Sequence, residues 1–358
     1  MASKSANEAT LKHSTVKERL KDQRILMLIC IAAIIIIVSI INPRFFTAKN
    51  FVLIFHQISV VGLLTMGMAM LLLSGGIDLS IGNILALSGC VMSYIIAGPA
   101  GVVSSGSVDS ELVTSVESAG TADPSLVAIA VLVGFGIALG CGALNGVIVA
   151  KSKCMPLIIT LGMSNVYYGI ALVITGGKYC SFDGAFEVIR QARFLEMEGS
   201  DGGLIPITLF FFIGIVILTW WLISKTKYGR RVIAIGGNEE NARLCGIKVD
   251  RYKIVTYAIS GLFCGLAAII FASKLDSITA SAGSDYAFSA LTGAIIGGIT
   301  FDGGKGTIMG AFLGCFFMGL LSNAMNILNI DTNVQQIVSG AIIVGAVVMS
   351  NLNNLRRK

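Results

Sequence analysis

Charged residues are scarce in this chain. Asp, Glu, Lys and Arg make up only 13% of its 358 residues, whereas a soluble domain carries about 25%. A water-soluble fold of this length would have too few ionised groups to cover its surface. The 55% share of hydrophobic residues and the mean hydropathy of +0.84 agree with this. The composition therefore excludes an ordinary soluble protein and indicates an integral membrane protein.

Residues that carry catalytic or metal chemistry are also few. The chain has 2 His, and none of its 8 Cys forms a C-x-x-C pair or a cluster with His. Five of the cysteines lie inside apolar runs, which is typical of small buried residues: Cys30, Cys90, Cys141, Cys264 and Cys315. We expect no catalytic residue, no metal site and no cofactor in this chain.

A phosphate-binding loop of the form G-x-x-x-x-G-K-[ST] is absent as well. In the nearest stretch Lys305 follows Gly304, but Ile299 stands where the first Gly is required. Gly306 occupies the place of the Ser or Thr that would bind Mg²⁺. We therefore expect any ATP that this protein uses to be hydrolysed by another chain.

Glycine is abundant, with 42 residues, while proline is rare, with 5. Small residues allow helices to pack closely in lipid. A bilayer core about 30 Å thick requires about 20 apolar residues per helix, and backbone polar groups in lipid must be satisfied within the helix. These rules predict an all-α, polytopic membrane bundle of about ten helices, at residues 25–42, 51–73, 79–98, 125–149, 155–175, 204–223, 254–273, 286–300, 307–328 and 334–351.

Two of these predicted spans have glycine-rich interruptions. The span 286–300 is short, and Gly75-Gly76 stands just before the span 79–98, so we expect broken or re-entrant segments at 74–82 and 286–306. The sequences 74–90 and 296–315 also resemble one another weakly, since each has Gly-Gly-Ile before a polar break. Transporters are often built from repeated halves with discontinuous helices, although coincidence in a glycine-rich chain explains the similarity equally well.

Basic residues lie mainly between the apolar runs, which indicates topology signals rather than nucleic-acid binding. The predicted inner loops carry most of the Lys and Arg, whereas the charged residues of loop 99–124, on the predicted outer side, are all acidic. The short loop with Arg44 and Lys49 breaks this pattern. We predict both termini in the cytoplasm, with a basic segment 1–24, a membrane domain 25–352 and a tail 353–358.

The longest predicted cytoplasmic loop, 224–253, contains the signals of a short helix at about 239–245. Asn238 suits the N-cap, Glu239 and Glu240 suit the first turn, and Gly246 suits the position after the helix. Gly236 and Gly237 permit a tight approach before it. A two-turn helix is unstable alone, so a cytoplasmic partner grips it or neighbouring helices support it as an ordinary connection.

The same loop resembles the coupling loop of permease subunits in the ribose, xylose and galactoside class of bacterial ABC importers. That family typically reads T-x-x-G-R-x-x-x-A-I-G-G-N-x-x-A-A-x-x-x-G-I. The chain departs at Asn241, where the family has Ala. It matches at Thr226, Gly229, Arg230, Ala234, Ile235, Gly236, Gly237, Asn238, Ala242, Gly246 and Ile247.

Three further stretches fit this family in the same order. They are the GGIDLS-x-G element at 75–82, PLIITLGM at 156–163 and the glycine-rich element at 297–307, with the Asn145-Gly146 pair between the first two. The resemblance covers about residues 25–355. By this resemblance, the ATPase-coupling residues are Gly236, Gly237, Asn238, Glu239, Glu240, Ala242, Arg243, Leu244 and Gly246, and a bulky residue at Gly237 or Gly246 should uncouple transport.

The resemblance implies a permease in the cytoplasmic membrane of a bacterium, surrounded by lipid, that imports a ribose-, xylose- or galactose-like sugar by alternating access. Two permease subunits, identical or different, would form the pathway. Two cytoplasmic ATPase subunits would bind ATP and Mg²⁺, and an external solute-binding protein would deliver the sugar. No nucleic acid is expected as a partner.

Polar residues near membrane depth are candidates for the pathway. An ionised Asp in lipid costs a few kcal/mol, so Asp78 should line a cavity at a broken helix, or lie at the cytoplasmic interface with Ser80 capping the next helix. Amides suit a neutral polyol but equally join helices. The candidate pathway residues are Asp78, Ser80, Asn83, Asn145, Asn165 and Asn323.

Two other classes of function stay open at this stage. An ABC permease for a nucleoside, an amino acid or a signalling sugar would have the same fold and coupling loop. An ion-coupled secondary transporter would need intramembrane carboxylates, for which Asp78, just before the predicted span 79–98, is the one candidate.

Overall fold

The computed structural model describes residues 23–98, 102–103, 123–191, 193–194 and 205–355. Most of the predicted segment 1–24, most of loop 99–124 and the last three residues lie outside this part. The helices are α2 (Gln23–Ile41), η1 (Pro43–Phe46), α3 (Ala48–Leu73), α4 (Ile81–Ala97), α6 (Pro124–Ser152), α7 (Pro156–Thr175), α8 (Glu187–Gln191), α9 (Ile207–Lys225), α10 (Lys227–Gly237), α11 (Glu239–Leu244), α12 (Val249–Leu275), α13 (Tyr286–Ile296), α14 (Ile308–Ile327) and α15 (Thr332–Leu355).

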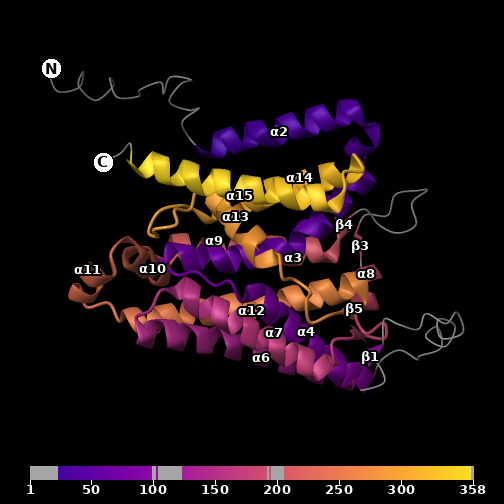
Figure 1. Ribbon diagram of the computed structural model, residues 1–358, viewed down its shortest axis with the longest axis horizontal. Coiled ribbons are helices and arrows are strands. Elements are labelled where there is room, and N and C mark those ends of the chain that lie inside the picture. The colour runs from indigo at the N-terminus through magenta and orange to yellow at the C-terminus, as the bar shows by residue number, and fades with distance from the viewer. Residues whose placement is uncertain (1–22, 99–101, 104–122, 192, 195–204, 356–358) are drawn as a thin grey trace, which may run out of the picture.

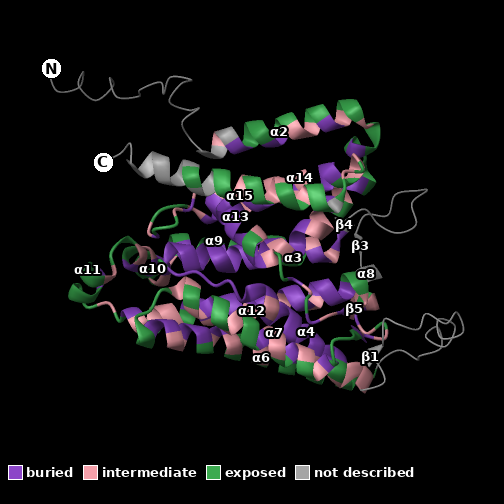
Figure 2. Ribbon diagram, in the orientation of Figure 1, coloured by how far each residue is buried: buried purple, intermediate pink, exposed green. Residues whose placement is uncertain are grey.

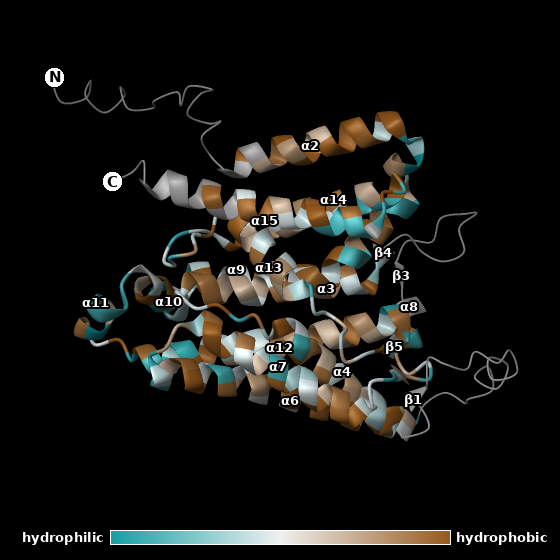
Figure 3. Ribbon diagram, viewed as in Figure 1, coloured by the Kyte–Doolittle hydropathy of each residue, from teal (hydrophilic) through white to brown (hydrophobic). Residues whose placement is uncertain are grey.

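Helices α3, α6, α7, α9, α12 and α14, 6 in all within the described residues, are long and apolar enough to cross a membrane. Shorter apolar helices lie at Met27–Ile41, Ile81–Ala97, Tyr286–Ile296 and Asn333–Gly345. Each of the predicted spans coincides with one of these long or short helices, and Figure 3 shows how hydrophobic they are. The predicted all-α membrane bundle is confirmed.

Helix α3 runs through the centre of the bundle. Its inner part is almost continuously buried from Ile58 to Leu73, and it contacts α9, α12, α13 and α14. Helices α2 and α15 lie at the periphery, where exposed side chains predominate (Figure 2). A helix that is hydrophobic on all sides, as α3 is, belongs in the interior of a bundle.

Helices α6 and α12 approach each other through glycine. A Cβ added to Gly142 would lie 2.5 Å from the Tyr257 carbonyl oxygen, and one added to Gly261 would lie 2.3 Å from the Ala138 carbonyl oxygen. Backbone contact of this kind is how helices associate in lipid, where apolar burial gives little driving force. The contact holds α12 close to α6, and α12 in turn supports the segment around Ile77.

The two ends of the molecule differ. Helices α10 and α11 lie at one end, where α2 begins and α15 ends (Figure 1). The strands lie at the other end: β1 (Val102–Val103), β2 (Tyr179–Ser181) and β5 (Ser277–Ile278) form an antiparallel sheet, and β3 (Arg193–Phe194) pairs with β4 (Ile205–Pro206).

Two segments are interrupted where the sequence predicted it. Helix α3 ends at Leu73 and α4 begins at Ile81, while α13 has only 11 residues, about 16 Å of helix. Both interruptions begin with a Schellman motif. Gly76 N donates to Leu71 O at 2.8 Å, and Ile299 N donates to Ala294 O at 3.1 Å. The backbone then continues without helix through 74–80 and 297–307.

Candidate functional site

Helix α11 has the caps that the sequence predicted. Asn238 Oδ1 accepts a hydrogen bond from Asn241 N at 2.8 Å. Gly246 has a φ of 78°, and the adjacent Ile247 N donates to Ala242 O at 3.1 Å, which completes another Schellman motif. The predicted short helix is confirmed, and it ends at Leu244.

One side of α11 is attached to the bundle and the other is free. Ala242 is buried against Ile235 and Val249. Glu240 is exposed, and Leu244 is 82% exposed. A large apolar side chain so exposed outside the membrane spans is an unusual feature that favours a partner surface.

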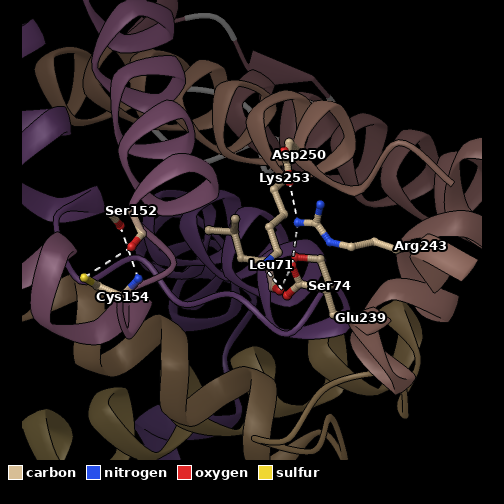
Figure 4. Close-up of polar contacts among 8 residues, drawn as sticks. All are labelled: Leu71, Ser74, Ser152, Cys154, Glu239, Arg243, Asp250 and Lys253. Carbon is tan, nitrogen blue, oxygen red and sulfur yellow. Dashed lines mark hydrogen bonds and ion pairs between the residues drawn. The ribbon is translucent and has the colours of Figure 1, made fainter. Parts of the chain in front are cut away.

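Ion pairs tie α11 to the beginning of α12 (Figure 4). Glu239 pairs with Arg243 at 3.0 Å and with Lys253 at 2.5 Å, and Arg243 also pairs with Asp250 at 2.5 Å. Partial burial alone would raise the pKa of Glu239, but the hydrogen bonds from Lys253 and Arg243 outweigh it and lower this pKa. The hydrogen bonds to Glu239 and Asp250 raise the pKa of Arg243.

Helix α10 was not predicted. The sequence interpretation placed one helix in the loop, with Gly236 and Gly237 as a turn before it, whereas both glycines are the last residues of α10. The signals were present, because Thr226 Oγ1 accepts a hydrogen bond from Gly229 N at 3.3 Å as an N-cap. Val232 and Ile235, three residues apart, form its buried face.

Gly236 is where α10 contacts the first interrupted segment. A Cβ on Gly236 would lie 2.0 Å from the Leu73 carbonyl oxygen and 2.6 Å from Gly304 N. A Cβ on Gly237 would meet nothing within 4 Å. A single methyl group therefore fits at Gly237, while Gly246 requires a positive φ. The expectation that a bulky residue at Gly237 or Gly246 uncouples transport stays a prediction.

The second interrupted segment meets the same point. A Cβ on Gly304 would lie 2.6 Å from Gly237 Cα, and one on Gly303 would lie 2.9 Å from Gly75 Cα. Gly304 N also donates to Leu73 O at 3.2 Å. We call the set Gly75, Gly236, Gly237, Gly303 and Gly304 the glycine junction. It brings the end of α10 into backbone contact with both interruptions.

Asp78 lies in the first interruption and is 1% exposed. Its Oδ1 accepts hydrogen bonds from Ser80 N at 2.8 Å and Ser80 Oγ at 2.6 Å, and its Oδ2 accepts from Asn145 Nδ2 at 3.1 Å. Tyr167 donates to Asn145 Oδ1 at 2.8 Å. We call Asp78, Ser80, Asn145 and Tyr167 the Asp78 network.

The Asp78 network contradicts one part of an alternative from the sequence, the capping of α4 by the Ser80 side chain. Ser80 makes no side-chain cap for α4, because its hydroxyl is engaged with Asp78. Neighbouring residues are held as well: Tyr257 donates to Ile77 O at 2.8 Å, and Leu79 N donates to Thr160 Oγ1 at 3.2 Å. Residues 77–80 are therefore anchored to α6, α7 and α12, and neither tyrosine was anticipated.

The other predicted pathway residues lie apart from the Asp78 network. Asn83 Nδ2 donates to Ser164 O at 3.0 Å and Ser164 Oγ at 2.7 Å on α7. Asn165 is exposed on α7, and Asn323 is buried on α14. The structure thus brings Asp78, Ser80 and Asn145 together, while the role of all six residues in transport stays a prediction.

A cavity of about 230 Å³ lies among α3, α12, α13, α14 and α15. Its polar lining includes Gln57, Lys274, Asp285, Ser289 and Ser322. None of the predicted pathway residues lines it. These side chains carry no motif and come from distant segments, so sequence patterns had no means of grouping them.

The chain is similar to known permease proteins over nearly its whole length. Residues 50–347 match the family model described as the branched-chain amino acid transport system / permease component. The chain is 34% identical to the ribose import permease protein of Bacillus subtilis (strain 168), over 88% of this chain and 89% of the relative. It is 35% identical to the ribose import permease protein of Escherichia coli (strain K12), over 90% and 92%. For the D-allose transport system permease protein of Escherichia coli (strain K12), the identity is 34% over 90% of each chain. No solved structure matches the chain significantly.

Proposed function

The chain belongs to the family of permease subunits of ABC-type sugar importers, and from this premise we propose that it imports a monosaccharide with energy from separate ATPase subunits. The similarity to ribose and D-allose permeases over nearly the whole chain supports a monosaccharide as solute. A nucleoside, an amino acid or a signalling sugar is the alternative that keeps the same coupling.

The observation that carries the proposal is the position of α11. Its free face, with Glu240 and Leu244, is available to a cytoplasmic ATPase subunit. Its other face is joined to α12 by ion pairs, and α10 before it ends in the glycine junction. A push on α11 therefore reaches the ends of both interrupted segments through backbone contacts, which bend less than side chains do.

We propose that the interrupted segments change position when the ATPase subunits close. Close-packed interfaces shift between discrete arrangements rather than deforming continuously. The Asp78 network holds residues 77–80 in the arrangement described here, and its rearrangement would expose polar groups to the sugar. Asp78, Ser80, Asn83, Asn145, Asn165 and Asn323 remain the proposed pathway residues, together with those of a second permease subunit.

Orientation and partners belong to the same proposal. The basic loops around α10 and α11 favour the cytoplasm, so we place both chain ends there and the short strands outside. This arrangement suits an external solute-binding protein on the strand side and two ATPase subunits on the α11 side.

The test is uptake by a reconstituted complex. Proteoliposomes that contain this permease, its ATPase subunit and its solute-binding protein should accumulate labelled ribose or allose. They should do so only when ATP is present on the side of the membrane where the ATPase subunit lies. Uptake of a nucleoside or an amino acid instead would support the alternative solute. Uptake by the permease alone, driven by an ion gradient, would contradict the proposal and favour a secondary transporter.

A further inference from the structure

A groove of about 480 Å³ lies beside α11, between α10 and the beginning of α12. We call it the basic groove, and its lining consists of Tyr228, Arg231, Gly246, Ile247, Lys248, Arg251, Tyr252 and Val255. Three of these residues are cationic and none is acidic. The groove was not anticipated from the sequence, because its basic residues were interpreted only as topology signals.

The three cations of the groove are not neutralised within the described part of the chain. Arg231, Lys248 and Arg251 form no ion pair there. Of the acidic side chains nearby in the sequence, Glu239 and Asp250 are engaged by Arg243 and Lys253 instead, and Glu240 is exposed on the free face of α11. The groove therefore presents a concentrated positive charge to the cytoplasmic boundary, which attracts anions.

The beginning of α12 adds to this positive field. Its N-cap position is Lys248, which makes no side-chain cap hydrogen bond, and the acidic residue in its first turn, Asp250, is paired with Arg243. The first backbone N–H groups of a helix carry partial positive charge and favour a negative ligand. A basic residue in place of the usual Ser, Thr, Asp or Asn cap leaves these groups without a side-chain acceptor.

Tyr252 holds Arg231 at the wall of the groove, and Tyr228 supports Tyr252. The Arg231 guanidinium lies 5.5 Å from the centre of the Tyr252 ring and donates a hydrogen bond to the Tyr252 hydroxyl. The Tyr228 and Tyr252 rings are 5.8 Å apart, and the Tyr228 hydroxyl contacts Thr256 Oγ1 at 2.7 Å. The cation is thus positioned before any ligand arrives.

The other end of the groove is apolar and belongs to α12, a helix long and apolar enough to cross a membrane. Val255 is 45% exposed and lies one residue inside the predicted span 254–273. An exposed valine at the edge of a membrane span is suited to contact with the acyl chains of the bilayer. A ligand that fits both ends must carry a phosphate on one part and a hydrocarbon chain on another.

We propose that the basic groove binds the headgroup of an anionic phospholipid. Basic pockets at the cytoplasmic ends of membrane helices are suited to such headgroups. Gly246 and Lys248 belong to the short link from α11 to α12, so the lipid contacts the segment that the ATPase is proposed to push. Binding itself does not depend on the proposed transport function.

The experiment measures lipid retained by the full-length protein. Purified permease is titrated with phosphatidylglycerol or phosphatidylcholine, and bound lipid is counted by native mass spectrometry. The groove variant is R231Q/K248Q/R251Q. The matched control, K151Q/K153Q/K227Q, removes the same charge from basic residues outside the groove.

Wild type and control should retain phosphatidylglycerol in preference to phosphatidylcholine, with binding to the groove variant about a hundredfold weaker. Equal retention by the groove variant and the control overturns the proposal. So does displacement of the lipid by millimolar inorganic phosphate alone, which would indicate a small-anion site, or by the ATPase subunit, which would indicate a protein interface.

The single variant K248Q keeps the test valid if the triple variant does not fold. It should weaken phosphatidylglycerol binding while leaving the elution of the protein on size exclusion unchanged. No difference between K248Q and the single control K227Q would contradict the assignment.

Discussion

The structural role of the Asp78 carboxylate can be measured separately from its proposed role in transport. It accepts three hydrogen bonds from Ser80 and Asn145 while 1% exposed. In D78N, an amide NH₂ would face the donor groups of these partners. An unsatisfied buried polar group costs about 1–3 kcal/mol, so we expect a lower Tm for the purified protein.

The control for D78N is N165A. Asn165 is exposed on α7, and its side chain makes no hydrogen bond to another described residue, so its truncation should change the unfolding free energy by no more than about 0.5 kcal/mol. A melting curve for D78N that overlays the curve for N165A would show that the Asp78 network does not stabilise the interrupted segment.

Predictions for single residues were right where the role of the residue depends only on its neighbours in the sequence. Asn238 as N-cap and Gly246 in the left-handed conformation follow from side-chain chemistry and from φ alone. Tyr167 and Tyr257 were missed because they act across the fold, on Asn145 and on the Ile77 carbonyl. An aromatic residue in an apolar run looks the same whether its hydroxyl has a distant partner or none.

At the scale of single elements, the exposed face of α11 makes a direct prediction. Leu244 is 82% exposed, and truncating a large anchor residue at an interface costs more than about 1 kcal/mol of binding free energy. L244A should weaken copurification of the ATPase subunit and leave the Tm of the permease unchanged. Full copurification by L244A would place the contact elsewhere.

The ion pairs of α11 predict a pH dependence. The pKa of Glu239 is lowered by folding, so its contribution to stability is present above the unfolded value of about 4.3 and is lost as pH falls through the lower folded value. At neutral pH, E239Q should therefore exchange the α11 amides faster than wild type, and the difference should disappear in acid.

The matched control for this prediction is E240Q, which removes the neighbouring carboxylate. Glu240 is exposed and makes no ion pair with another described residue. Its variant should exchange hydrogen like wild type at every pH. Equal acceleration in both variants would mean that general charge, not the pairing of Glu239, holds α11.

Element bounds show what hydropathy does and does not determine. The apolar runs gave the spans, but α12 begins at Val249, five residues before the predicted start of the span, because its first turns carry Asp250, Arg251 and Lys253 outside the lipid. Helix α10 was missed because it also lies outside the apolar runs. Its amphipathic pattern is short and basic, and the glycines at its end suggested a turn.

Over the whole molecule, the arrangement of both ends predicts which natural cysteines are accessible from the cytoplasm. Cys154, in the turn after α6, and Cys245, at the end of α11, are both exposed. A membrane-impermeant thiol reagent should label them in inside-out vesicles and not in intact cells. Labelling in intact cells would reverse the proposed orientation.

Contacts between distant segments are what a single sequence leaves undetermined. Each glycine pair of the junction is visible in the sequence, and two of the pairs were predicted to mark broken helices. Nothing in the spacing of Gly75, Gly236 and Gly304 indicates that they meet, because backbone contact through glycine leaves no complementary side chains to match. The cavity around Gln57 was hidden in the same way.

The central claim is that motion of α11 reaches the interrupted segments through the glycine junction. G236A places a methyl group 2.0 Å from the Leu73 carbonyl oxygen, whereas G237A places one in open space. The decisive measurement compares sugar uptake and ATP hydrolysis by reconstituted complexes that carry either variant. We predict that G237A transports like wild type, while G236A hydrolyses ATP with little uptake. Equal uptake per ATP in the two variants would contradict the account.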